Sequence, residues 1–253
     1  MRPAAFALTM IAMLGAAAAR AQIAPLFVIP TESSVDTSIP ASAPLRVLLT
    51  AHDPEKLAAS LGMRPPSGSS SFEYVVGGYP QVVGPVDRTW LEATFVIDYD
   101  QPGFAPLLTE LQTFGARPTR AQLVQFVADT IDERTPRNWD LASTIAQRRQ
   151  GDCSEHAVLT TALARTQGIP ARVMVGIALL SNGQTFDAYG HAWAEMKEDG
   201  QWVVADAAML EHAGNVRYIP MGVMEDEGMG YVMSLAGLSS QWIQSVKVLG
   251  PAD

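Results

Sequence analysis

The 253-residue sequence contains a single cysteine, Cys153, and few basic side chains. One thiol cannot form a disulfide within its own chain, so reactivity becomes a serious interpretation of this residue. The 26 Asp and Glu residues outnumber the 17 Lys and Arg residues, the formal net charge is −9, and the basic residues form no cluster. This balance argues against nucleic acid or an anionic lipid surface as a partner.

Long apolar runs are also missing after the first residues. Residues 1–21 begin with a positive charge at Arg2, continue with an apolar stretch and end in Ala-Arg-Ala, as a secretory signal with its cleavage site does. No later stretch approaches the ~18 continuous apolar residues that a membrane-spanning helix needs. We therefore expect export to the periplasm or the medium, with no membrane insertion after signal cleavage. An uncleaved anchor is the alternative.

The rest of the chain divides by composition. Residues 22–44 are rich in Pro, Ser and Thr, and predict a linker or extended arm. Residues 45–112 predict a small β-rich N-terminal region, and residues 113–253 the main domain. Short apolar or alternating runs in the N-terminal region predict strands at 45–50, 72–76 and 88–99.

From residue 119 the apolar period becomes helical. Thr119 can cap a first helix, Asp140 a second, and a third begins near Cys153 and ends at Gly168-Ile169-Pro170. Apolar runs separated by turn residues then predict strands at 172–180, 191–196 and 202–206. Helices followed by antiparallel strands indicate an α+β domain.

Cys153 lies at the expected start of the third helix. The free N–H groups and the dipole at a helix N-terminus favour a thiolate over a thiol, and the thiolate is the nucleophile. The neighbours Asp152, Ser154, Glu155 and His156 are polar. The alternative is an inert cysteine that packs as a small hydrophobe, and this polar setting argues against it.

The hairpin between the last two predicted strands decides whether His191 and Asp206 can meet. A four-residue loop over 197–200 puts them directly opposite each other. A two-residue loop, Asp199-Gly200, puts them diagonally on one face, whereas a regular three-residue loop separates them. Two of the three geometries let Asp206 accept a hydrogen bond from the imidazole and fix its tautomer. An incidental pair in a structural hairpin is the alternative.

These residues belong to a wider pattern that closely resembles the core of the transglutaminase-like superfamily. The resemblance covers about residues 119–210 and is carried by Gly151-Asp152-Cys153-Ser154-Glu155-His156-Ala157, Ala162-Leu163-Ala164-Arg165, Gly168-Ile169-Pro170-Ala171-Arg172, Gly176, His191-Ala192-Trp193-Ala194-Glu195 and Trp202-Val203-Val204-Ala205-Asp206. It implies a papain-like α+β fold with helices packed on an antiparallel sheet. It also implies a catalytic triad, with Cys153 as nucleophile, His191 as general base and then acid, and Asp206 as orienting carboxylate. Neither a metal nor an organic cofactor is implied.

The sequence departs from the family pattern after the aspartate. Ala207-Ala208 follow Asp206, where the family commonly has Pro and a small hydroxyl residue. This changes the exit from the strand and leaves the carboxylate in place.

A second oxyanion-hole donor, besides the N–H of the cysteine, is not evident. Gln147 lies six residues before the cysteine, the separation of the oxyanion glutamine in papain-like enzymes, and Gln150 and Trp139 are its rivals. Trp193, two residues from the histidine, is a candidate wall of a substrate groove, with sheet packing as the alternative.

The function we expect is acyl transfer on peptide or protein amide bonds through a thioester. Water as acceptor makes the protein a cysteine protease or amidase, and an amine makes it a transglutaminase. The alternatives are a non-catalytic binding or scaffold module with the same fold, a zinc site that adds His156 to the triad, and a copper site at Met221, Met224, Met229 and Met233. Methionines scattered through an apolar stretch more often fill packing gaps.

Overall fold

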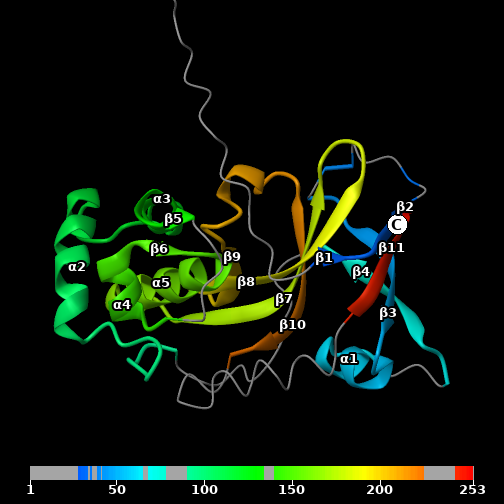
Figure 1. Cartoon of the computed structure of the whole chain (residues 1–253), viewed down its shortest axis with the longest axis horizontal. Helices are drawn as coiled ribbons and strands as arrows, with labels where there is room; N and C mark the ends of the chain where they lie inside the picture. The colour runs from blue at the N-terminus through cyan, green and yellow to red at the C-terminus, as the bar shows by residue number, and fades with distance from the viewer. Residues whose placement is uncertain are drawn as a thin grey trace, which may run out of the picture.

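The computed structural model describes residues 28–33, 35, 39–40, 42–64, 68–77, 90–133, 140–224 and 243–252. The described part consists of a central five-stranded sheet, a layer of helices and a second, four-stranded sheet (Figure 1). The expected signal segment lies outside the described residues. No helix in the described ranges has both the length and the apolar character needed to cross a bilayer.

The central sheet is antiparallel throughout and contains the three strands predicted after residue 170. Its order is β1 (Val28–Ile29), β8 (Phe186–Glu198), β7 (Ala171–Ser181) and β10 (Val216–Val223), with β9 (Gln201–Ala205) also paired to β8. Every residue of β7 is buried, and the strand has a neighbouring strand on both edges, β8 and β10. Its run of Val, Ile, Leu and Ala side chains suits that position.

One edge of β8 contains a gap. On its first edge, residues 186–196 pair with β7. On the other edge, β9 pairs with residues 194–198 and β1 pairs with residues 188–189. Among the described strands, residues 190–193 therefore have no partner on this edge, and His191 lies in the gap.

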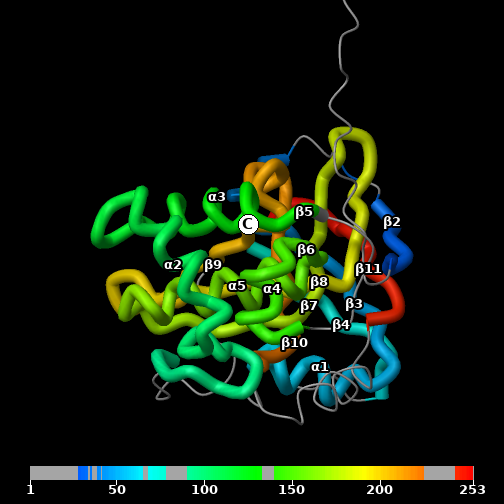
Figure 2. The backbone as a smooth tube through the Cα atoms, turned by 60° about the vertical axis from the view of Figure 1, so that its left-hand side comes forward, coloured from blue at the N-terminus to red at the C-terminus, as the bar shows by residue number. Residues whose placement is uncertain are grey.

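The helices α3 (Arg120–Thr130), α4 (Ala142–Arg148) and α5 (Cys153–Thr166) form the layer beside this sheet, and α5 packs against β7 and β8 (Figures 1 and 2). Both α3 and α5 begin with a capping box. In α3 the Thr119 hydroxyl accepts from the N–H of Gln122, whose side chain accepts from the N–H of Thr119. The predicted starts of these two helices are confirmed.

The start of α4 is not the predicted one. Asp140 does not cap this helix; its carboxylate accepts from Arg148 at 2.9 Å. Asp98, far away in sequence, instead accepts from the main-chain N–H of Ser143 at 2.7 Å and from its hydroxyl at 2.6 Å. The first turn of α4 is thus capped by a residue distant in sequence, and not by Asp140 as the local sequence predicts.

The strand predicted over 88–99 is wrong across residues 90–99, and residues 88–89 lie outside the described ranges. The segment turns at Thr94, whose hydroxyl accepts from the N–H of Ile97 at 3.1 Å. Val96 and Ile97 are both buried while Phe95 is exposed, so the alternation breaks. Three short helices that the sequence did not predict follow: η1 (Pro102–Phe104), α2 (Ala105–Leu111) and η2 (Gln112–Phe114).

The second sheet takes strands from both ends of the chain. Its order is β2 (Thr31–Ser33), β11 (Ile243–Pro251), β3 (Leu45–Ala51) and β4 (Ser71–Val76), with α1 (Pro54–Ser60) beside it. The predicted strands at 45–50 and 72–76 are confirmed. Because β11 pairs with β3, a boundary at 112/113 does not separate the two sheets. The segment expected as a linker or arm contributes β1 to one sheet and β2 to the other.

The helices and the second sheet cover the same face of the central sheet. Val173 and Val175 pack with the helices, whereas Ile177 and Leu179, further along the same face of β7, pack with the second sheet. This arrangement confirms the α+β class, with helices packed on an antiparallel sheet and a strand-containing N-terminal region.

Candidate active site

Cys153 is the first residue of α5 and only 2% exposed. The loop before it is fixed by the capping box of α5. Asp152 accepts from the N–H of Ser154 at 2.9 Å, and Glu155 accepts from the N–H of Asp152 at 2.8 Å. A Cβ at Gly151 would lie 2.2 Å from the Cβ of Glu155, so the close turn before the cysteine requires glycine. The thiol is thereby held at the positive end of the helix dipole.

The Glu155 carboxyl beside this cysteine is buried together with Asp152. Burial raises the pKa of Glu155, hydrogen bonds from the N–H groups of Asp152 and Asp140 lower it, and the charge of Asp152 raises it; the result is a pKa of about 7. The capping carboxyl therefore changes protonation near neutral pH.

His191 and Asp206 are joined by a hydrogen bond of 2.7 Å from Nε2 to Oδ2, and both side chains are buried. The hairpin between their strands has a two-residue loop, since Glu198 pairs with Gln201. The prediction of a diagonal pair is confirmed, and the directly opposite pair of a four-residue loop is wrong. Both loop residues have positive φ, 48° at Asp199 and 80° at Gly200. Asp-Gly is the usual sequence for such a turn, a signal that favours the two-residue loop from the start.

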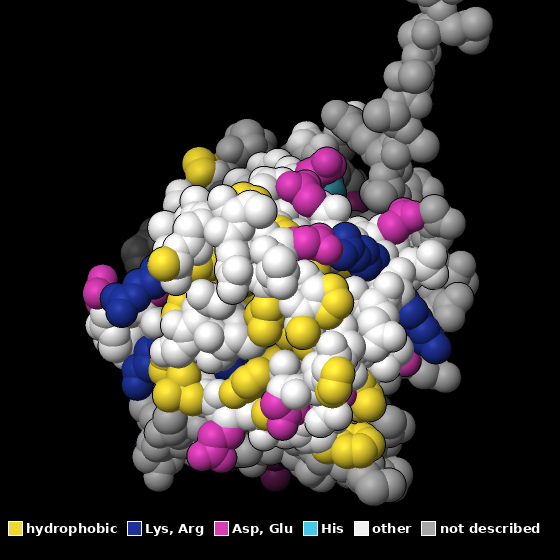
Figure 3. Space-filling view, turned by 90° about the vertical axis from the view of Figure 1, so that its left-hand side faces the viewer, with side chains coloured by type: hydrophobic (Ala, Val, Ile, Leu, Met, Phe, Trp, Pro, Cys, Tyr) yellow, Lys and Arg dark blue, Asp and Glu magenta, His cyan; other side chains and the backbone are white. Residues whose placement is uncertain are grey.

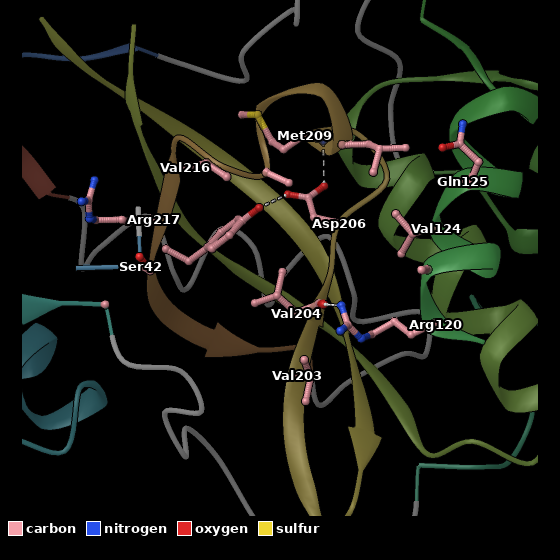
Figure 4. Close-up of a pocket in the computed structure, with 15 residues that line it drawn as sticks. Ser42, Arg120, Val124, Gln125, Val203, Val204, Asp206, Met209, Val216 and Arg217 are labelled. Atoms are coloured by element: carbon pink, nitrogen blue, oxygen red, sulfur yellow. Dashed lines mark hydrogen bonds between the residues drawn. The ribbon is translucent and has the colours of Figure 1, made fainter. Parts of the chain in front are cut away.

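Two further groups hold the carboxylate of Asp206. The N–H of Met209 donates to Oδ1 at 3.1 Å (Figure 4), and the hydroxyl of Tyr218 donates to Oδ2 at 2.8 Å. Burial raises the pKa of Asp206, but the charge of His191 and these hydrogen bonds lower it. The segment Ala207-Ala208 therefore still turns back onto the carboxylate despite its departure from the family pattern.

Sequence reasoning missed Met209 and Tyr218. Met209 stands three residues after the aspartate, the spacing of a side chain that accepts from a following N–H. Tyr218 comes from β10, a strand that does not neighbour β9, and its contact with Asp206 leaves no pattern in the sequence.

The imidazole of His191 interacts with both other groups. Burial lowers its pKa, but the charge of Asp206, the charge of Cys153 and hydrogen bonds to both raise it to about 10. Since Nε2 bonds to Asp206, Nδ1 is the nitrogen left for the thiol. The arrangement therefore places a thiol beside an imidazole that can be protonated at neutral pH, the setting in which a cysteine becomes nucleophilic.

Trp193 does not wall a groove, because its side chain is fully buried. Its ring centroid lies 4.9 Å from that of Tyr218 and 6.1 Å from that of His191. A Cβ at Gly176, the partner of His191 on β7, would lie 2.9 Å from the Trp193 ring and 2.1 Å from the main-chain oxygen of Ile219. The ring therefore packs behind the histidine, which is the sheet-packing alternative.

Gln147 is exposed on α4, and its amide donates to the main-chain oxygen of Ser143 at 3.2 Å. A Cβ added at Gly103 would lie 1.9 Å from Nε2 of Gln147, so this amide packs against Gly103. The contacts of Gln147 are thus with α4 and η1. Of its rivals, Gln150 lies in β6 (Gln150–Gly151) and Trp139 is outside the described residues.

His156 lies one turn along α5 from the cysteine. Its Nδ1 is 2.7 Å from the main-chain oxygen of Asp152, and the charges of Asp206 and His191 act on it. Within the described ranges, no group of three or more His, Cys, Asp or Glu residues is arranged to hold a metal ion. Met221 and Met224 are buried in two different apolar clusters, and Met229 and Met233 lie outside the described residues.

A buried ion pair ties β7 to β8 near the site. Arg172 Nη2 lies 2.7 Å from the carboxylate of Glu195, and neither side chain is exposed. The guanidinium also lies over the ring of Trp202, 4.2 Å from its centroid. Arg172 and Glu195 are also direct partners in the register of the two strands.

Residues 118–207 match the family model described as the Transglutaminase-like superfamily. The match contains the cysteine, the histidine and the aspartate described above. This part of the chain is thus similar to the core of that superfamily.

Several solved structures are similar to part of this chain. The first is a "putative cysteine protease" from Cytophaga hutchinsonii, with 17% identity, a TM-score of 0.41, and coverage of 65% of this chain and 52% of that one. The periplasmic domain of TgpA from Pseudomonas aeruginosa follows, with 24% identity, a TM-score of 0.33, and coverage of 43% and 42%. A structure described as a TGase has 20% identity, a TM-score of 0.29, and coverage of 42% and 30%. The chain thus spans about half or less of each of these structures. Comparison with curated protein sequences gives no match.

Proposed function

We propose that this protein is a thiol-dependent enzyme that breaks peptide or protein amide bonds, with Cys153 as nucleophile, His191 as base and acid, and Asp206 as orienting carboxylate. One observation carries the proposal: a buried imidazole that bonds to a carboxylate at 2.7 Å and interacts with a thiol at a helix N-terminus. This geometry supplies the nucleophile, the proton carrier and its orienting group together.

In the first half-reaction, the Cys153 thiolate attacks the amide carbon, an S–C bond forms and the π electron pair moves to oxygen. The free N–H of Cys153 at the helix start can donate to this oxyanion. When the carbonyl re-forms, the C–N bond breaks, and the amine leaves with a proton from His191. A thioester remains on the sulfur.

In the second half-reaction, neutral His191 removes a proton from water, and the water oxygen attacks the thioester carbon. The C–S bond breaks, the carboxylic acid leaves, and the thiolate and imidazolium are restored. Water is the acceptor in this proposal. An amine in place of water would give transamidation by the same first half-reaction.

A non-catalytic binding module is the second candidate, and the observation that favours it is Ala207-Ala208 after the aspartate. Against it, the Met209 N–H still reaches Asp206, so the substituted segment leaves the carboxylate held. A catalytic role therefore accounts for more of the contacts in the site than a binding module does.

The test is hydrolysis of a panel of peptide amides, together with labelling by an electrophilic peptide. We expect Cys153→Ala to abolish both and His191→Ala to slow hydrolysis by at least about 100-fold. His52→Ala, which removes an exposed histidine far from the site in sequence, is the matched control and should leave both unchanged. Hydrolysis that persists in Cys153→Ala would contradict the proposal.

We also propose that residues 1–21 are removed on export, so that the enzyme works in the periplasm or the medium. The support is the charge, apolar run and Ala-Arg-Ala of this segment. N-terminal sequencing of the exported protein should begin at Gln22. A membrane-retained protein that still carries residues 1–21 would contradict export by cleavage.

A further inference from the structure

The carboxylate of Asp206 accepts three hydrogen bonds. Oδ1 accepts from the main-chain N–H of Met209 at 3.1 Å, and Oδ2 accepts from the hydroxyl of Tyr218 at 2.8 Å (Figure 4). The same Oδ2 bonds to Nε2 of His191 at 2.7 Å. Tyr218 belongs to β10, whereas His191 belongs to β8 and Met209 to the turn after β9. The oxygen that faces the imidazole is therefore shared with a hydroxyl from a separate strand.

The segment that follows the aspartate has no side-chain donor to offer. Ala207, Ala208 and Met209 carry neither an N–H nor an O–H in their side chains, and the turn then continues into η3 (Leu210–His212). What this segment gives the carboxylate is a main-chain N–H, and that group contacts Oδ1. The hydroxyl on Oδ2 thus has to come from elsewhere in the fold, and Tyr218 supplies it.

The central sheet makes room for this contact. β10 pairs with β7, so the Tyr218 side chain passes β7 and β8 to reach a carboxylate that follows β9. The residues of β7 in register with the contact are small, because Ala178 is opposite Tyr218 and Gly176 is opposite His191. A Cβ at Gly176 would lie 2.9 Å from the ring of Trp193, whose centroid is 4.9 Å from that of the tyrosine. Small side chains on β7 therefore leave space for the two aromatic rings.

The contact is also shielded from water. Asp206 is 9% exposed and Tyr218 is 8% exposed, and hydrogen bonds to a carboxylate are strong where water is scarce. On the face that carries the helices, Figure 3 shows described acidic and basic side chains mixed together. Exposed charges of mixed sign act weakly on a buried carboxylate, because they offset one another and are screened by salt. The donors in direct contact therefore decide how this carboxylate is held.

The three donors restrict the orientation of the carboxylate in different ways. With the Met209 N–H alone, the group could turn about Oδ1 and carry Oδ2 out of the plane of the imidazole. A second donor on Oδ2 prevents this turn, and the imidazole then takes the remaining lone pair of that oxygen. The direction of the bond to Nε2 in turn determines where Nδ1 of His191 points. The Tyr218 hydroxyl thus acts on the histidine through the aspartate.

We propose that Tyr218 is a positioning residue of the candidate site, whose hydroxyl fixes Oδ2 of Asp206 toward His191 and so aims Nδ1 at the thiol of Cys153. Its effect on the thiol is independent of turnover, whereas its effect on catalysis rests on the proposed function. The Tyr218 ring adds to this role, since its centroid lies 6.3 Å from that of the imidazole with 28° between the planes.

The test variant is Tyr218→Phe, which removes the hydroxyl and keeps the ring that packs on Trp193. The matched control is Tyr99→Phe, which removes a hydroxyl that donates to the main-chain oxygen of Leu91 at 2.7 Å. Each variant loses one tyrosine hydrogen bond, so urea unfolding should show both to be folded with similar losses of stability.

A double-mutant cycle shows whether Tyr218 acts through Asp206. The measurement is the rate of iodoacetamide alkylation of Cys153 at pH 6.5. We expect Tyr218→Phe to slow alkylation about fivefold in the wild-type background and less than about twofold in the Asp206→Asn background. Tyr99→Phe should leave both rates unchanged. Equal slowing in both backgrounds would mean that the tyrosine acts only through packing, and faster alkylation would mean that its hydroxyl only competes with the imidazole for Oδ2; either result would overturn the proposal.

Turnover separates this proposal from the previous one. With active protein, Tyr218→Phe should lower kcat for peptide amides about tenfold and leave KM unchanged, because proton transfer by the histidine is impaired and substrate binding is not. A raised KM with unchanged kcat would make Tyr218 a substrate-binding residue and overturn the proposal. If no peptide is hydrolysed while the cycle shows coupling, the proposed enzyme function fails and the positioning role stands. If peptides are hydrolysed and Tyr218→Phe equals wild type in kcat and in alkylation, the positioning role fails alone.

Discussion

Asp206→Asn tests the electrostatic argument for the site most directly. The charge of Asp206 is the largest influence that raises the pKa of His191, against a burial that lowers it. Asparagine keeps the size of the side chain and one acceptor oxygen while it removes the charge. The pKa of His191 should then fall, because burial lowers it and the charge of Asp206 no longer opposes that effect, and the positive charge beside Cys153 should be lost at neutral pH.

The size of the effect follows from ionisation. A free thiol with a pKa near 8.5 is only about 1% ionised at pH 6.5, so an ion pair can increase the reactive fraction up to about 100-fold. A less basic thiolate is also a weaker nucleophile, which reduces the expected gain to about tenfold. Cys153 is nearly fully buried, which limits how fast the reagent reaches the sulfur. Wild type and variant share this burial, so it does not change the ratio of their alkylation rates.

The assay is the rate of iodoacetamide alkylation of Cys153 between pH 5.5 and 10, followed by mass spectrometry. We expect wild type to react about tenfold faster than Asp206→Asn at pH 6.5. The two rates should converge toward pH 10, where a thiol ionises without help. Asp187→Asn, on the strand that carries His191, removes a carboxylate that accepts from Asn182 in the exposed hairpin and serves as the control. Equal alkylation rates for wild type and Asp206→Asn at pH 6.5 would contradict the electrostatic argument.

Three further predictions concern stability. The pKa of His191 is raised from 6.5 to about 10 in the folded protein, so its contribution to the free energy of unfolding is complete below pH 6.5 and is lost as the pH rises to 10, a change of at most about 5 kcal/mol. Urea unfolding should therefore show a flatter dependence of stability on pH for His191→Gln than for wild type. An unchanged dependence on pH would contradict this. Glu195→Gln leaves the charge of Arg172 buried without its partner and should cost about 3–5 kcal/mol in the same assay, whereas a loss below about 1 kcal/mol would show that the pair contributes little. Gly176→Ala should cost about 1–3 kcal/mol, since its Cβ meets main-chain oxygen, and more than Gly103→Ala, whose Cβ meets only a flexible amide; the reverse order would contradict the packing argument.

Much of the helical layer could be predicted because its signals are local. Thr119 and Asp152 each begin a helix with a capping box, and both partners of each box lie within four residues. The start of α4 has no such local cap, and its partner Asp98 comes from 45 positions away. The alternation over 88–99 failed for a related reason, since alternation predicts a strand only where a neighbouring strand is present to pair with it.

In the candidate site, too, local features can be predicted from the sequence and tertiary contacts cannot. Cys153 and the strand face of His191 follow from pattern, and the Asp199-Gly200 turn carries enough information to set the register of the hairpin. The buried position of Trp193 and the contact of Tyr218 with Asp206 do not follow from it, because they depend on how β10 and the turn after β9 pack.

Helix starts, strand faces and hairpin registers depend on residues a few positions apart, so the candidate groups of the site can be predicted from the sequence. How these groups meet depends on the tertiary structure. Among the described strands, the fold leaves His191 without a partner on one edge of β8, and it brings Tyr218 and the Met209 N–H onto Asp206. These contacts join segments distant in the chain, and their free energy comes from burial and charge in the folded state.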